Sequence, residues 1–168
     1  VWALALDQDT KTLFSGSSDT TVKVWTRDGS GSYAEQQTLS GHSSNVWALA
    51  LDQDTKTLFS GSQDETIKVW TPDGSGNYDA SSTQTLTGHS AIVAALAYDQ
   101  DSKTLFSGYI DGTIKVWTRD GSGTYHDTQT LSVHSSYSYL RSLAYDQGTK
   151  TLFSGSDGMT MKVWTTGK

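Results

Sequence analysis

Short apolar runs recur along the chain, and each is bounded by polar turn residues. One kind of run covers residues 1–7, 46–52, 93–99 and 140–146, and every copy ends in Asp. Such runs are too short for a helix once the flanking turns are counted. They predict short strands that are buried on both faces.

Further strand signals follow each of these runs. A second strand is predicted at residues 12–15 and a third at residues 21–26, where apolar and β-branched residues alternate with polar ones. After the third strand comes a Gly- and Ser-rich loop that ends in an aromatic residue, which we expect to fix the loop to the fold: Tyr33, Tyr78 or Tyr125. A fourth, short strand is predicted at residues 37–39, 84–86 and 129–131.

The whole pattern repeats. The Trp residues that end the third strands stand at positions 25, 70, 117 and 164, so their spacings are 45, 47 and 47 residues. A period of this length is typical of stacked-unit architectures, in which each unit buries its faces mainly against its neighbours. We expect four units, at about residues 1–45, 46–92, 93–139 and 140–168, the last without its outer strand.

The best-preserved part of the unit carries a family resemblance. It reads Gly41-His42, then Ser60-Gly61-Ser62, then Asp64, and it ends in Thr-Ile-Lys-Val-Trp70. This pattern closely resembles the WD-repeat β-propeller family over essentially the whole chain. It departs from the family in one respect, because Thr rather than Asp follows each terminal Trp. The resemblance implies an all-β propeller of four-stranded blades.

The resemblance also implies a structural hydrogen-bond network of His, Ser, Asp and Trp inside each blade. A buried carboxylate at a tight turn needs donors, and imidazole, hydroxyl and indole groups supply them. The second blade would use His42, Ser60, Asp64 and Trp70, and the third His89, Ser107, Asp111 and Trp117. The first has Ser15, Asp19 and Trp25 without a His, and the fourth has His134, Ser154 and Trp164 with its turn Asp one place early.

Composition argues against several partners. The net charge is −6 and the 12 Lys and Arg residues are spread over the repeats, so neither nucleic acid nor an anionic membrane is expected. There are no cysteines. Because we also find no apolar run of about 20 residues and no signal peptide, we expect a cytoplasmic location.

No catalytic or metal-binding motif stands out. The chain has neither a Gly-x-Ser-x-Gly elbow nor a phosphate-binding Gly-Lys-Ser/Thr, and its chemical residues are repeated where an active site would break the repeat. No two histidines lie at ligand spacing, and His126 is expected in a solvated loop. We therefore expect no enzyme, no metal and no cofactor.

Positions that vary between repeats are the candidates for partner binding. In the resembling family, partners often dock on the ring face formed by the links before strand one and the turns before strand three. The matching residues are Trp2, Asn45, Trp47, Ile92, Tyr139, Arg141, Gln63 and Ile110. Aromatic residues and Arg anchor interfaces, so this set favours a scaffold that binds a protein or peptide. A second interpretation, in which Trp2 and Trp47 only pack across the central channel, stays open.

Four blades suggest an incomplete ring. Propellers close with about four to eight blades, and WD-type rings usually need seven or eight. Two chains joined head to tail would give eight blades through heterologous contacts. The alternatives are a fragment of a longer propeller, or a self-assembling structural repeat, recently amplified or engineered, that has no specific ligand.

Overall fold

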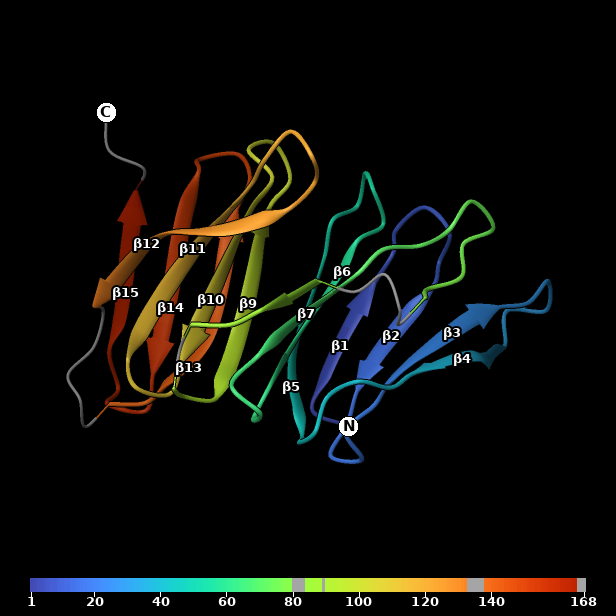
Figure 1. Cartoon of the computed structure of the whole chain (residues 1–168), viewed down its shortest axis with the longest axis horizontal. Helices are drawn as coiled ribbons and strands as arrows, with labels where there is room; N and C mark the ends of the chain where they lie inside the picture. The colour runs from blue at the N-terminus through green and yellow to red at the C-terminus, as the bar shows by residue number, and fades with distance from the viewer. Residues whose placement is uncertain (80–83, 89, 133–137, 166–168) are drawn as a thin grey trace.

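The chain folds into antiparallel β-sheets joined by tight turns. The computed structural model describes residues 1–79, 84–88, 90–132 and 138–165. The described residues form 15 strands in four separate sheets, three with four strands and one with three. We number these sheets as blades 1 to 4 in chain order, and Figure 1 shows them side by side from blue to red. No helix in this part of the chain is long and apolar enough to cross a membrane.

Within each blade the strands lie in sequence order. Blade 1 contains β1 (Ala3–Leu6), β2 (Leu13–Gly16), β3 (Val22–Arg27) and β4 (Tyr33–Leu39), and blade 2 contains β5 (Val46–Leu51), β6 (Leu58–Ser62), β7 (Ile67–Trp70) and β8 (Gln84–Leu86). Blade 3 contains β9 (Val93–Asp99), β10 (Thr104–Tyr109), β11 (Thr113–Arg119) and β12 (Tyr125–Ser132). Blade 4 contains β13 (Leu140–Asp146), β14 (Thr151–Ser156) and β15 (Met161–Thr165).

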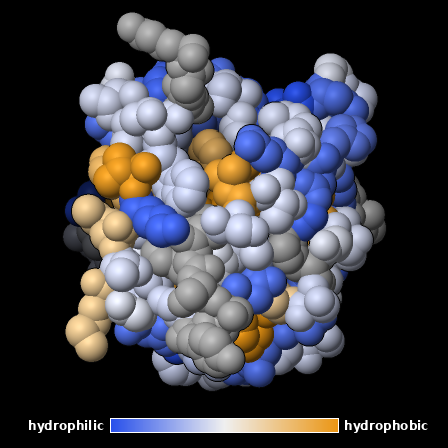
Figure 2. Space-filling view, turned by 90° about the vertical axis from the view of Figure 1, so that its left-hand side faces the viewer, coloured by the Kyte–Doolittle hydropathy of each residue, from blue (hydrophilic) through white to orange (hydrophobic). Residues whose placement is uncertain are grey.

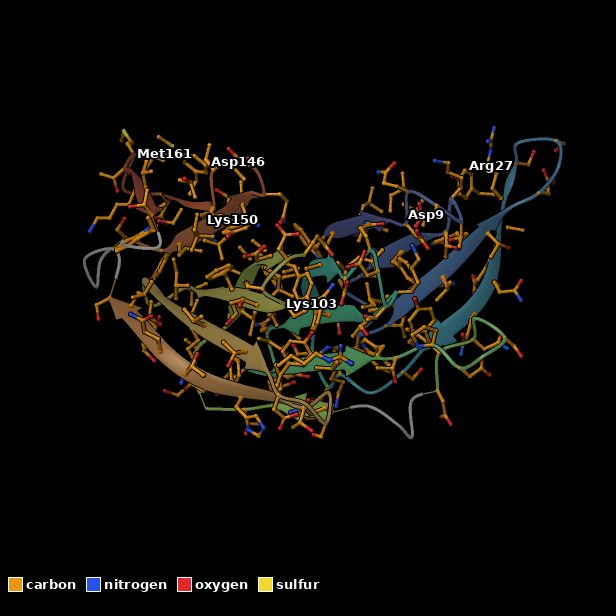
Figure 3. The ribbon with its side chains drawn as sticks, turned by 90° about the horizontal axis from the view of Figure 1, so that it is seen from above. Asp9, Arg27, Lys103, Asp146, Lys150 and Met161 are labelled. Atoms are coloured by element: carbon orange, nitrogen blue, oxygen red, sulfur yellow. The ribbon has the colours of Figure 1, made fainter. Side chains whose placement is uncertain are left out.

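The four blades follow an open arc. The first strands of successive blades contact one another, β1 with β5, β5 with β9 and β9 with β13. Seen from above, Asp9 and Arg27 of blade 1 lie at one end of the arc and Asp146 and Met161 of blade 4 at the other (Figure 3). The structure therefore has the blades of a propeller in a row whose ends do not meet.

The hydrophobic core lies between blades rather than inside them. One cluster joins Phe14 and Val24 of blade 1 to Leu58 and Trp70 of blade 2, and a second joins blades 2 and 3 around Phe59. A third joins blade 3 to blade 4. Because a single sheet has no second layer of its own, each blade depends on its neighbours for burial.

A glycine on the second strand sets how closely two blades approach. A methyl group placed on Gly16 would lie 2.7 Å from Val46, one on Gly61 would lie 2.5 Å from Val93, and one on Gly108 would lie 2.3 Å from Leu140. These distances are too short for a Cβ, so only glycine allows the next blade's first strand to pack there.

A polar ladder joins the turns that follow the first strands. Lys56 of blade 2 pairs with Asp7 of blade 1 at 2.8 Å, and Lys103 of blade 3 pairs with Asp52 of blade 2 at 3.3 Å. Lys150 of blade 4 pairs in the same way with Asp99 at 3.2 Å. Burial alone would raise the pKa of Asp99, but hydrogen bonds from Ser102, Tyr145 and Lys150 lower it to about 2.

Glutamine side chains run beside this ladder. The Gln53 amide donates to the Leu6 carbonyl at 3.0 Å, and the Gln8 backbone N–H donates to the Gln53 Oε1 at 3.1 Å. Gln100 and Gln147 repeat both bonds at the next two blade contacts. The same polar contacts, made by equivalent residues of the unit, therefore recur at all three contacts between neighbouring blades.

The structure corrects three details of the sequence interpretation. The outer strands β4 and β12 begin at Tyr33 and Tyr125, earlier than predicted, so these tyrosines start strands rather than end loops. His126 accordingly lies in β12, where its Nε2 is 2.8 Å from the Asp120 carboxylate, and not in a loop. The first strands of blades 1 and 4 are not buried on both faces, because Leu4 in β1 is 63% exposed and only Leu140 in β13 is buried.

Candidate interaction face and the hydrogen-bond networks behind it

Blade 2 contains a continuous chain of side-chain hydrogen bonds. The Trp70 indole N–H donates to the Ser60 hydroxyl at 2.8 Å, and Ser60 lies 2.8 Å from His42 Nε2. The His42 Nδ1 is 2.8 Å from the Asp64 carboxylate. A carboxylate only accepts, so Nδ1 carries the proton and Nε2 accepts from Ser60. The network joins the link before β5 to β6, the following turn and β7.

The electrostatics of this network favour a neutral histidine beside a charged aspartate. Burial lowers the pKa of His42 and outweighs the opposite effect of Asp64. Burial would raise the pKa of Asp64, but hydrogen bonds from Thr66, from the Ser43 backbone N–H and from His42 lower it overall. The group is a structural brace, because all of its members are already satisfied by one another.

The other blades share part of this brace. The Trp indole donates to the matching Ser in each of them, Trp25 to Ser15 at 2.8 Å, Trp117 to Ser107 at 2.8 Å and Trp164 to Ser154 at 3.2 Å. Asp19 and Asp111 accept from Thr21 and Thr113 in their own turns. His89 and His134, predicted for the third and fourth networks, lie outside the described residues. In blade 4 the early Asp157 instead accepts from Arg141 at 3.3 Å.

Backbone hydrogen bonds bring five of the predicted binding positions together in pairs, with Asp157 as the sixth member. The Gln63 N–H donates to the Asn45 carbonyl at 2.9 Å, Ile110 to Ile92 at 3.1 Å and Asp157 to Tyr139 at 3.1 Å. Each bond ties the turn before a third strand to the link before a first strand. We call the surface formed by these six residues and the adjoining Trp2, Trp47 and Arg141 the link–turn face.

A β-bulge lies at the start of three first strands. Val46 pairs with Ser62 and Ala48 with Gly61, so Trp47 is an extra residue between them. Arg141 is the extra residue in blade 4, and Ala94 occupies that place in blade 3. A bulge leaves its residue out of the regular pleat and redirects the side chain, and such bulges are often conserved beside functional sites. The variable positions therefore coincide with a break in the regular sheet.

Two aromatic residues meet at the blade 1 end of this face. The rings of Trp2 and Trp47 stack with centroids 5.1 Å apart and planes 8° from parallel, and Trp2 is 57% exposed. They therefore pack on each other from neighbouring blades. The buried Trp47 indole N–H has no hydrogen-bond partner among the described residues. An unpaired buried donor costs about 1–3 kcal/mol of stability.

Charge and aromatic surface meet at the blade 4 end. The Arg141 guanidinium lies 5.4 Å from the ring centroid of the exposed Tyr139 and 3.3 Å from the Asp157 carboxylate. Between the two ends, Asn45 and Ile92 are half-buried, Gln63 is exposed, and Ile110 packs partly against the core. The face thus has anchors at both ends and smaller side chains in the middle.

The described residues hold no group of three or more His, Cys, Asp or Glu side chains that could bind a metal ion. The sequence also contains no unit that departs from the repeat with a nucleophile and base of its own.

Comparison with known proteins agrees with the fold. A family model described as "WD domain, G-beta repeat" matches residues 1–26, 34–71, 80–118 and 126–165. The chain belongs to the WD-repeat family. A search of curated proteins found no match. The second and fourth matches begin inside β4 and β12, so the family's repeat starts on the outer strand of one blade and continues into the next blade.

Sequence reasoning missed two features of the face. The bulges were not foreseen, because a bulge changes the pairing of a strand without changing its composition. The ion pair between Arg141 and Asp157 was also missed, although the displaced Asp in the fourth turn was the visible signal.

The hydrogen-bond brace of blade 2 predicts that removing the Ser60 hydroxyl lowers the free energy of unfolding more than removing the Ser15 hydroxyl of blade 1. Ser60→Ala would leave the buried Trp70 N–H and His42 Nε2 without their partner, so we expect the free energy of unfolding to fall by about 3 kcal/mol. The matched control Ser15→Ala removes one bond, to the half-buried Trp25, and should cost about 1 kcal/mol. Urea unfolding measures both, and equal losses would contradict a His-linked brace in blade 2.

Proposed function

We propose that the chain is a non-catalytic scaffold that binds a protein or peptide on the link–turn face. The observation that carries the proposal is the coincidence of variable side chains with the bulges and turns. The rest of each unit is repeated and internally satisfied, whereas Trp47 and Arg141 occupy positions that the sheet does not use. Members of the family generally serve as interaction scaffolds, which supports the same conclusion.

The residue types on the face suit a polypeptide ligand. Trp, Tyr and Arg are the side chains that most often supply binding energy at interfaces. The Trp2–Trp47 stack presents apolar surface, because Trp2 is 57% exposed. Arg141 already has Asp157 as a partner, so a carboxylate on the ligand would compete with that pair.

A displayed random-peptide library tests this proposal. Peptides selected on the wild-type chain should bind Trp47→Ala and Tyr139→Ala at least tenfold more weakly, because interface aromatics typically contribute more than about 1.4 kcal/mol. The control is Tyr33→Ala, which removes an aromatic of similar exposure, 43% against 47%, from an outer strand. Selected peptides that lose affinity only with Tyr33→Ala, or equally with all three variants, would contradict the proposal.

A second candidate function is self-assembly, and the two ends of the arc favour it. Gly155 stands where Gly16, Gly61 and Gly108 stand in the other blades, but a methyl group placed there would meet only Ser142 of its own blade. Val1, the counterpart of Val46, Val93 and Leu140, is 74% exposed. Each end therefore presents one half of the blade-to-blade contact.

The polar residues at the two ends of the arc are complementary as well. Lys11 would take the place of Lys56 and reach Asp146, and Gln8 would take the place of Gln53 beside Gln147. Apolar side chains are exposed on the same surfaces, with Met161 and Val163 in blade 4, and the side of the molecule at the blade 4 end shows apolar patches among polar atoms (Figure 2). Exposed apolar patches of this kind mark interaction surfaces. We infer that two chains join head to tail through these ends in an eight-bladed ring.

Light scattering with a charge swap tests the assembly. The wild type should have twice the monomer mass at micromolar concentration. Lys11→Glu would face Asp146 with like charge and should raise the dimer dissociation constant at least tenfold, and the added change Asp146→Lys should restore it. A monomer of 18.2 kDa in the wild type, or a double variant no better than Lys11→Glu, would contradict the inferred contact.

A further inference from the structure

One buried side chain holds the segment that leads from blade 1 into blade 2. We call residues 41–45 the blade 2 link. Only His42 is buried among these residues, with its side chain 1% exposed, whereas the other four are exposed or half-buried. A segment that buries so little surface opens readily unless specific contacts hold it. The position of the blade 2 link therefore depends on the contacts of His42. Blade 2 itself packs between blades 1 and 3, so these are the contacts of an interior blade.

Two backbone N–H groups also join the blade 2 link to the turn before β7. The Ser43 N–H donates to the Asp64 carboxylate at 3.0 Å, and the Gln63 N–H donates to the Asn45 carbonyl at 2.9 Å. Asp64 is the residue that accepts from His42, and Asn45 and Gln63 belong to the link–turn face. The imidazole and this part of the face are therefore held by the same turn.

A second proton on the imidazole would reverse one hydrogen bond of the brace. His42 Nδ1 already donates to Asp64, so the added proton goes to Nε2, which accepts from the Ser60 hydroxyl in the neutral form. The Ser60 oxygen would then accept from both His42 and Trp70, and its own proton would lose its acceptor. Because Ser60 is completely buried, water does not replace that acceptor. The docked site thus disfavours the charged imidazole.

Burial and two charged side chains set the proton affinity of the imidazole. Burial is the largest effect and disfavours the charged form, Asp64 favours it, and Lys68 of β7 disfavours it. The other strands of blade 2, β5, β6 and β8, contain no titratable residue, and Glu65 in the turn is exposed. The balance places the pKa of His42 below its ordinary value of 6.5.

Proton uptake consequently favours the released link. In water the imidazole has its ordinary pKa of 6.5, so it binds a proton more readily there than in the docked link. Docking is at full strength above about pH 6.5 and weakens as the pH falls below that value. Because one proton is taken up, the docking constant falls by at most about tenfold per pH unit. The pKa of Asp64 is lowered from 3.8, so this carboxylate stays ionised over the same range.

We propose that His42 makes the blade 2 part of the link–turn face sensitive to pH, because uptake of a proton at Nε2 releases the blade 2 link from the turn before β7. This part of the face is then ordered at neutral pH and loosened in mildly acidic solution, where Asn45 and Gln63 are no longer held together. The inference concerns the chain alone and holds whether or not a peptide binds to the face.

Amide hydrogen exchange at pH 7 and pH 5, followed for each residue by NMR and corrected for intrinsic exchange rates, tests the proposal. Protection of the Ser43 and Gln63 amides should fall by about threefold or more between the two conditions. The control is the Thr21 amide, which donates to Asp19 in blade 1, a blade that contains no histidine, and which should keep its protection. Constant protection at Ser43 and Gln63, or an equal loss at Thr21, would overturn the proposal.

Two variants distinguish a proton-sensing histidine from one that only braces the blade. His42→Gln has no titrating group, so protection of the Ser43 amide should become independent of pH over this range, whatever its level. Lys68→Gln removes a cation that disfavours the charged imidazole and should raise the pH at which His42 titrates. The same change in blade 1, Lys23→Gln, should not. A wild-type His42 that titrates at or above about pH 6.5, or a His42→Gln chain that keeps the wild-type pH dependence, would overturn the proposal.

Discussion

The contact between one blade and the next is what the rest of the structure depends on. A single sheet of four short strands cannot bury its own two faces, so its apolar side chains are covered only when another blade packs against them. Gly16 and Val46 set how closely the two blades approach. The Lys56–Asp7 pair aligns them at the turns that follow their first strands. The same two features recur at each later contact, so the direction and spacing of the array are fixed by a contact used three times.

The residues that hold each blade together are distinct from the residues of the link–turn face. The Trp70–Ser60–His42–Asp64 chain of hydrogen bonds satisfies its own members and has no group to offer a ligand. Trp47 and Arg141 lie at bulges beside it, outside the regular pairing, and Arg141 is exposed. A rigid frame behind variable side chains is the arrangement expected of an interaction surface.

Much of the fold could be predicted because the signals were local. The apolar runs, the turns and the Trp spacing predicted the strands and the repeat, and the Ser, Asp and Trp of the second unit indicated the brace. The contacts that escaped prediction are long-range. Lys56 and Asp7 are 49 residues apart, and Gln37 and Tyr78 are 41 apart. Nothing in the pattern of apolar and polar residues shows that a loop-closing tyrosine belongs to the groove of the preceding blade.

The features of the link–turn face were predicted less completely than the fold, for a related physical reason. Position in the repeat identified Trp2, Trp47, Tyr139 and Arg141, but a β-bulge is a feature of pairing between strands and leaves no mark on the composition of one strand.

Native-state hydrogen exchange followed against chain concentration tests the central claim, that each blade is stabilised by its neighbours through one repeated contact. At low concentration the amides of β5 and β9, whose blades have two neighbours, should be the most protected, and those of β1 and β13 should exchange through local opening. In the proposed head-to-tail ring, which forms as the concentration rises, protection of β1 and β13 should approach that of β5 and β9. Uniform protection of all four strands at low concentration would contradict the account.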